Sequence, residues 1–217
     1  MLRADLLTEL RYVIDDRVKP YYWTDARLVQ WLSEGQDKFC EQTGFWTDRS
    51  SYSITTVEGQ TDYPIPSDRI VEVLSVWDGW RRLEVFRDRD RPYHGEEFVT
   101  ATPNAPEFYQ VDGETGVISL YAPPIAGVVL TLRVKRLSKV SFATDDTELE
   151  IPEQFHLATV EYAASKAFGD HDRELQDPVK AADHALNFKR YRVDGERQWR
   201  RISGEKTGVA PSLAYVF

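Results

Sequence analysis

Residues 104–124 read NAPEFYQVDGETGVISLYAPP, and this stretch decides the fold. Aromatic and β-branched residues favour strands over residues 108–111 and 117–121, and the turn between them contains two glycines. Prolines close both ends of the stretch, because proline cannot donate a hydrogen bond to a strand ladder. We predict a β-hairpin here, at the centre of a β module, since apolar patterns with helical spacing lie far along the chain on either side.

Apolar residues recur at every second position around this hairpin, which is typical of half-buried strands. Asp78-Gly79 is a two-residue hairpin signal, and two prolines place residues 61–68 at a sheet edge or in a connection. We expect six or so short antiparallel strands in a small sandwich or barrel. The other predicted strands cover residues 52–57, 70–77, 82–86 and 128–140.

The apolar spacing becomes helical toward both ends of the chain. Thr24 and Asp177 are the expected N-cap residues of two helices, and Gly44 is the expected stop of one of them. Pro152 is expected in the first position of another helix. One face of the last helix carries Val179, Ala182, Leu186 and Val193. The four predicted helices cover residues 3–18, 24–43, 152–168 and 178–200.

The predicted fold class is α+β. The N- and C-terminal helices are expected to form a four-helix bundle, with an inserted antiparallel β-sandwich or barrel-like module and a C-terminal tail. The expected domains are an N-terminal helical pair, the β module, a C-terminal helical pair that completes the bundle, and an extended tail. These cover residues 1–48, 49–141, 142–201 and 202–217.

Composition excludes several classes of function. The 217 residues carry a net charge of -9, which argues against a general surface for nucleic acids or anionic membranes. No apolar run is long enough to span a membrane, and no signal-peptide pattern is present. The single cysteine, Cys40, excludes an internal disulfide and is expected in the core. We therefore expect a soluble protein without a membrane partner.

No catalytic or cofactor-binding motif is complete in the sequence. The best metal candidate is Glu153-x-x-His156, whose spacing puts both side chains on one helix face, but a helix-bundle di-metal site needs two such motifs. We therefore expect no catalytic, cofactor-binding or metal residues and no cofactor. Six tryptophans and eleven tyrosines favour an interaction protein instead, because these residues are common at interfaces.

The end of the last helix is basic in an otherwise acidic chain, and the tail after it ends in apolar residues. Cations suit a helix C-terminus, and an apolar end on a tail hints at docking into a partner. The predicted docking residues are Lys189, Arg190, Arg192, Arg197, Arg200, Arg201, Tyr215, Val216 and Phe217.

The order of these elements, together with five short motifs, carries a resemblance. The motifs are LVQWLSEGQ at 28–36, YPIPSD at 63–68, PEFY at 106–109, LYAPP at 120–124 and LEIPEQF at 149–155. With two helices, a β module, two further helices and a tail, the chain resembles the head-to-tail adaptor (connector) proteins of short-tailed and related phages.

The resemblance implies a structural virion protein and no enzyme. Such adaptors are made in the host cytoplasm and form a ring in the virion neck, usually twelve-fold, that joins the portal protein to a tail or nozzle protein. The ring extends the DNA channel, and DNA passes through it without specific binding. The resemblance also implies that residues 189–217 dock on the portal. Two alternatives remain open: a β-sandwich module that binds carbohydrate or protein, and a metal-dependent hydrolase.

Overall fold

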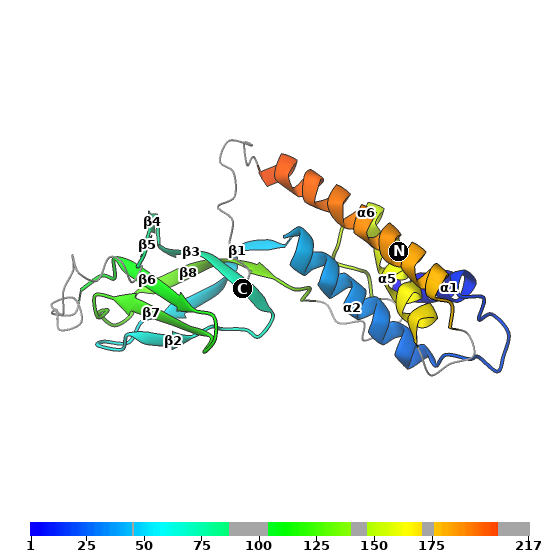
Figure 1. Ribbon diagram of the computed structural model, residues 1–217. Helices are drawn as coiled ribbons and strands as arrows, with labels where there is room; N and C mark the ends of the chain where they lie inside the picture. Colours follow the sequence, from blue (N-terminus) through cyan, green and yellow to red (C-terminus); the bar gives the residue numbers. More distant parts are fainter. Residues whose placement is uncertain (45, 87–103, 140–146, 171–175, 204–217) are drawn as a thin grey trace. The chain divides into compact units, whose positions relative to one another are not determined.

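The computed structural model describes residues 1–44, 46–86, 104–139, 147–170 and 176–203 (Figure 1). These residues contain four α-helices and two four-stranded sheets, so the predicted α+β class is confirmed. The chain divides into two compact units. The helical unit comprises Met1–Phe45 and Ser138–Phe217, and the sheet unit comprises Trp46–Leu137. No helix within the described ranges is long and apolar enough to cross a membrane.

The helical unit is organised around one helix, α5, which contacts the other three. Small side chains make this possible, because Ala158, Ala163 and Ala164 are fully buried and let neighbouring helices approach closely. The helices are α1 (Arg3–Val13), α2 (Asp25–Thr43), α5 (His156–Gly169) and α6 (Pro178–Ser203), and the 3-10 turn η2 (Glu153–Phe155) directly precedes α5.

The predicted helix caps are confirmed. The Thr24 hydroxyl accepts a hydrogen bond from the Arg27 amide at 3.3 Å, and Gly44 ends α2 with a left-handed φ of 65°. The Asp177 carboxylate accepts two amides from the first turn of α6, each at 3.1 Å. These hydrogen bonds lower the pKa of Asp177, so its carboxylate stays charged at the positive end of the helix dipole.

Two other predicted helix boundaries are wrong. The first helix ends at Val13 rather than Val18, because Asp15 adopts a left-handed φ of 56° that a helix cannot continue through. Pro152 does not occupy a first helical position. Its ψ of 142° is extended, and α5 begins only at His156 after the 3-10 turn.

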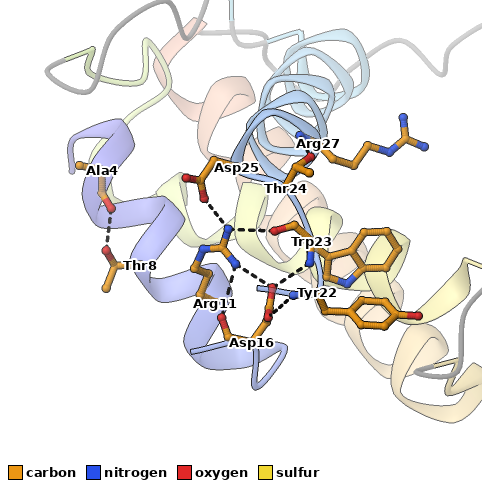
Figure 2. Close-up of polar contacts among 9 residues, drawn as sticks. All are labelled: Ala4, Thr8, Arg11, Asp16, Tyr22, Trp23, Thr24, Asp25 and Arg27. Carbon is orange, nitrogen blue, oxygen red and sulfur yellow. Dashed lines mark hydrogen bonds and ion pairs between the residues drawn. The ribbon is translucent and has the colours of Figure 1, made fainter. Parts of the chain in front are cut away.

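A buried ion pair holds the chain between α1 and α2 (Figure 2). The Arg11 guanidinium contacts the Asp16 carboxylate at 2.7 Å, donates to the Trp23 carbonyl at 3.1 Å and pairs with Asp25. The Asp16 carboxylate also accepts the amides of Tyr22 at 2.8 Å and Trp23 at 3.1 Å. The connection is therefore fixed by polar contacts that the apolar spacing of the sequence does not encode.

Two glycines mark close approaches between helices. A Cβ at Gly35 of α2 would lie 3.2 Å from the Thr159 Cα of α5. A Cβ at Gly195 of α6 would lie 2.7 Å from the Phe39 Cζ of α2, closer than real Cβ contacts allow. The absence of a side chain at Gly195 therefore sets how near α6 comes to α2.

The sheet unit contains two sheets whose apolar residues form one core cluster. Ile118 and Leu120 come from one sheet, Leu130 and Leu132 come from the other, and all four are fully buried. The first sheet has the strand order β1 (Thr47–Thr55), β8 (Val129–Arg136), β3 (Ile70–Asp78) and β4 (Arg81–Arg82). The second has the order β2 (Asp62–Pro64), β7 (Val117–Tyr121), β6 (Phe108–Asp112) and β5 (Glu84–Val85).

The hairpin that anchors the sequence prediction is present as β6 and β7. Its strands pair antiparallel from Phe108 opposite Tyr121 to Asp112 opposite Val117. The Asp112 carboxylate closes the turn by accepting the Glu114 amide and the Thr115 hydroxyl, and these contacts lower its pKa. Pro64 lies on the short edge strand β2, where a missing amide costs little.

Three details of the strand prediction are wrong. Asp78 still pairs with Arg81, so the two-residue turn is Gly79-Trp80, with Gly79 at a φ of 56°. Residues 82–86 do not form one strand, because the buried Leu83 separates β4 in one sheet from β5 in the other. The strands are also not all antiparallel, since β5 pairs parallel with β6.

Candidate docking surface on the last helix

Helix α6 packs along α5 and α2, mostly through half-buried side chains. Within residues 178–201 only Gly195 is buried. The face that carries Val179, Ala182 and Leu186 is exposed, with 70% of Val179 and 48% of Leu186 accessible. Three residues of the apolar face noted in the sequence therefore point to solvent, whereas the fourth, Val193, is half-buried.

The structure places all six predicted basic residues on the C-terminal half of α6 but gives them different contacts. Arg192 donates to Gln42 of α2 at 3.2 Å, and Arg190 donates to Asn187 at 3.3 Å. Lys189 makes no hydrogen bond or ion pair within the described ranges. The other three predicted docking residues, Tyr215, Val216 and Phe217, lie outside the described residues.

The remaining three arginines lie near the end of α6. Arg197 pairs with Asp194 at 3.4 Å, and Arg200 pairs with Glu196 one turn away. Arg201 makes no hydrogen bond or ion pair in the part of the chain that the structure describes. Within the described residues, four of the six cations therefore have a polar partner, whereas Arg201 and Lys189 have none.

A groove of about 500 Å³ lies between the 3-10 turn η2 and this end of α6. Two of the predicted docking residues, Arg197 and Arg201, line it. The other lining residues are Gln154, Phe155, Tyr191, Asp194 and Gln198. The groove therefore combines two aromatic rings, two amides, one carboxylate and two guanidinium groups.

The walls of this groove are fixed by contacts on both sides. The Gln154 amide donates to the Gln198 side-chain carbonyl across it. The Phe155 ring packs on Phe39 with ring centroids 5.1 Å apart, which ties the floor to the core of the helical unit. The sequence analysis missed Gln154, Phe155, Tyr191 and Gln198. Helical spacing places the last two on one face of α6, but no sequence pattern indicates the opposite wall.

A larger groove of about 930 Å³ lies where α2, α5 and the start of α6 meet. Its charged lining is mixed, with Arg27 and Lys166 beside Glu34 and Asp170, and Trp31 forms part of its wall. Because two cations and two carboxylates line it, this groove does not favour a partner of either charge.

The metal candidate of the sequence is used for packing. His156 is 1% exposed, its Nε2–H donates to the Ile151 carbonyl at 2.7 Å, and its Nδ1 lies 3.0 Å from the amino group of Met1. Burial lowers the pKa of His156, so the ring is held neutral. Within the described ranges no group of three or more His, Cys, Asp or Glu side chains could hold a metal ion. Cys40 is a buried free thiol, as predicted.

The family model described as SU10 adaptor protein matches residues 1–209. The chain belongs to this family. The match covers the sheet unit, the helical unit up to residue 209 and all of α6, so the resemblance to phage head-to-tail adaptors is confirmed. This adaptor is therefore a structural phage protein and a component of the virion, and it interacts with other virion proteins. No curated protein matches the chain in sequence.

Proposed function

We propose that this adaptor forms a ring beneath the portal and joins the head of the virion to its tail. The family match over residues 1–209 carries the proposal. In this role the adaptor acts without catalysis and without a cofactor, and its partners are the portal, a tail or nozzle protein, and further copies of itself.

The charge of the chain supports a role as part of a DNA channel. At a net charge of -9 the protein as a whole repels phosphate groups. A ring that lets DNA pass needs this property, because tight binding would slow ejection. We propose that DNA passes through the ring, usually twelve-fold in adaptors of this type, without specific contacts.

We propose that residues 189–217, the basic end of α6 and the segment after it, form the portal-docking segment. Two observations support this: the exposed side chains along α6, and the concentration of cations on its second half. Exposed charges at the rim of an interface mainly set orientation and association rate, whereas buried aromatic groups supply affinity. Arg200, Arg201 and Phe217 therefore have complementary roles in docking.

Electron microscopy of the adaptor mixed with its purified portal tests the proposal. The expected result is a closed ring of adaptor density on one face of the portal, with α6 against the portal. A portal that remains bare at high adaptor concentration contradicts the proposed function. A complex that places the sheet unit against the portal contradicts only the docking segment.

One observation favours a second binding role for the sheet unit. Trp80 at the turn between β3 and β4 is 89% exposed, and exposed tryptophans are common in binding surfaces. The alternative of a carbohydrate- or protein-binding module therefore centres on this residue. Trp80→Ala and the wild type are compared on a glycan array and in pull-downs with the tail protein. Loss of glycan binding in the variant indicates a carbohydrate site, and loss of the tail protein indicates a protein-binding site.

A further inference from the structure

The groove beside η2 offers more than a positive patch. The rings of Phe155 and Tyr191, which we call its aromatic floor, line it together with Arg197, Arg201 and Asp194. Arg197 is already paired with Asp194, whereas Arg201 has no ion-pair partner within the described ranges. The site therefore presents one cation available for a carboxylate directly beside an apolar aromatic floor.

Packing of Phe155 on the residues behind it sets the shape of the groove. Phe155 is backed by Phe39, and Phe39 is also the ring that Gly195 approaches. Gly195 lies between Tyr191 and Arg201 along α6. Its close contact with Phe39 therefore also positions these two residues at the groove. Core packing positions Phe155, whereas exposed side chains complete the lining: Gln154, Asp194, Arg197 and Arg201.

The surrounding charge selects the sign of a ligand. Between residues 189 and 201 six cations stand against two carboxylates, Asp194 and Glu196. An anionic group approaching this end of α6 is attracted over a distance of about one Debye length, roughly 8–10 Å at physiological salt. Within that field, Arg197 and Arg201 both line the groove, and Arg197 is paired with Asp194.

We infer that this groove receives an acidic side chain and an adjacent apolar or aromatic side chain from one segment of the portal. The carboxylate pairs with Arg201, and the apolar group covers Phe155 and Tyr191. This inference rests on the proposed function and adds the chemistry of the partner segment. A guanidinium suits the carboxylate, because it donates two parallel hydrogen bonds in a fixed geometry.

A matched pair of charge reversals tests the inference. Arg201→Glu and Arg190→Glu change the net charge equally and lie on the same helix, but only Arg201 lines the groove. Portal affinity is measured by biolayer interferometry at two salt concentrations. Arg201→Glu is expected to weaken binding about 100-fold, because like charges meet in a partly desolvated contact. Arg190→Glu is expected to weaken it only about threefold, through the general field.

Small probes test the groove without the portal. Phenylacetate carries a ring and a carboxylate, acetate lacks the ring, and phenylacetamide lacks the charge. In NMR titrations of the full chain, phenylacetate is expected to shift the side-chain amide signals of Gln154 and Gln198 at millimolar concentration. The other two probes are expected to shift them at least several-fold less, and Arg201→Gln is expected to remove the phenylacetate response.

The results separate the two ideas. If the wild type binds the portal and both charge reversals weaken binding equally, the proposed function stands and the groove inference is overturned. If acetate acts as well as phenylacetate, the site is a simple anion site and the inference is also overturned. If the portal does not bind at all but the probe response appears as described, the proposed function fails and the chemistry of the groove is retained.

Discussion

Arginines occupy two contrasting environments in the helical unit. Arg11 is 6% exposed, and its guanidinium is surrounded by Asp16, Asp25 and the Trp23 carbonyl (Figure 2). Its Cζ atom also lies 3.7 Å from the centre of the Tyr21 ring. At the end of α6, by contrast, the Arg197 side chain is 70% exposed, and the Asp194 side chain that it pairs with is 67% exposed.

The buried and the exposed arginine have different roles in the protein. A buried guanidinium cannot lose its proton, so burial is tolerated only when carboxylates and carbonyls take its charge and its hydrogen bonds. An exposed guanidinium with a partner one helical turn away gains little from that partner, because water and salt screen the pair. Arg11 therefore holds the fold, whereas the pair of Arg197 and Asp194 contributes little to it.

Removal of the buried carboxylate is the largest effect that we expect. Asp16→Ala leaves Arg11 without its main counter-charge and leaves the amides of Tyr22 and Trp23 without an acceptor. Breaking a buried pair in this way costs about 3–5 kcal/mol of unfolding free energy. Urea denaturation followed by circular dichroism measures the loss. Asp194→Ala is the matched control at the exposed pair, and equal losses in the two variants contradict the comparison.

The second prediction tests how α6, the helix that carries the exposed arginines, packs against α2. Gly195→Ala introduces a Cβ that would lie 2.7 Å from the Phe39 Cζ, so the Phe39 ring or one of the two helices must shift. Overpacking of this kind costs about 1–3 kcal/mol, and the gain of about 1 kcal/mol from helix propensity reduces the net loss. Thermal unfolding measures the change.

Two further variants decide the cause of that change. Gly169→Ala is the control, because its added Cβ would meet Ala181 at an ordinary 3.9 Å and should leave stability nearly unchanged. Combining Gly195→Ala with Phe39→Leu should cost less than the sum of the two single changes, because the smaller side chain makes room. Strict additivity of the two costs shows that Phe39 is not the obstacle.

Local signals in the sequence predicted the elements that local chemistry decides. Thr24 and Asp177 cap their helices as expected, and the hairpin around Asp112 has the expected strands. In each case the residues that form the contact lie within a few positions of one another. Such contacts depend on spacing that can be read directly.

Several of the errors lie where residues beyond the local pattern decide the structure. Nothing near Val18 indicates that the helix ends at Val13, because the carboxylate that organises the turn bonds to amides at Tyr22 and Trp23. The parallel pair of β5 and β6 joins segments separated in sequence, so no hairpin signal exists for it. The candidate groove needs Phe155 beside Tyr191, and only tertiary packing brings these two together.

The third prediction compares Arg11 with a buried group that can lose its proton. Burial lowers the pKa of His156 below that of a histidine in the unfolded chain, which is about 6.5. The unfolded state therefore binds more protons, so this contribution to stability is complete above about pH 6.5 and is lost as the pH falls below it. Chemical denaturation at pH 7.5 and pH 5.5 should show a decline that His156→Gln reduces. An identical decline in the variant assigns the pH dependence to other groups.

The smallest effect on stability is expected at the exposed pair of the groove. Arg197→Ala should change the unfolding free energy by less than about 0.5 kcal/mol, because exposed pairs contribute little. Portal binding should nevertheless weaken, since Asp194 then stands in the groove without its cation and repels an acidic partner. The double change Arg197→Ala with Asp194→Ala removes both charges and should restore most of the affinity. If the double variant binds as weakly as Arg197→Ala, then Arg197 contacts the portal directly and does not act by neutralising Asp194.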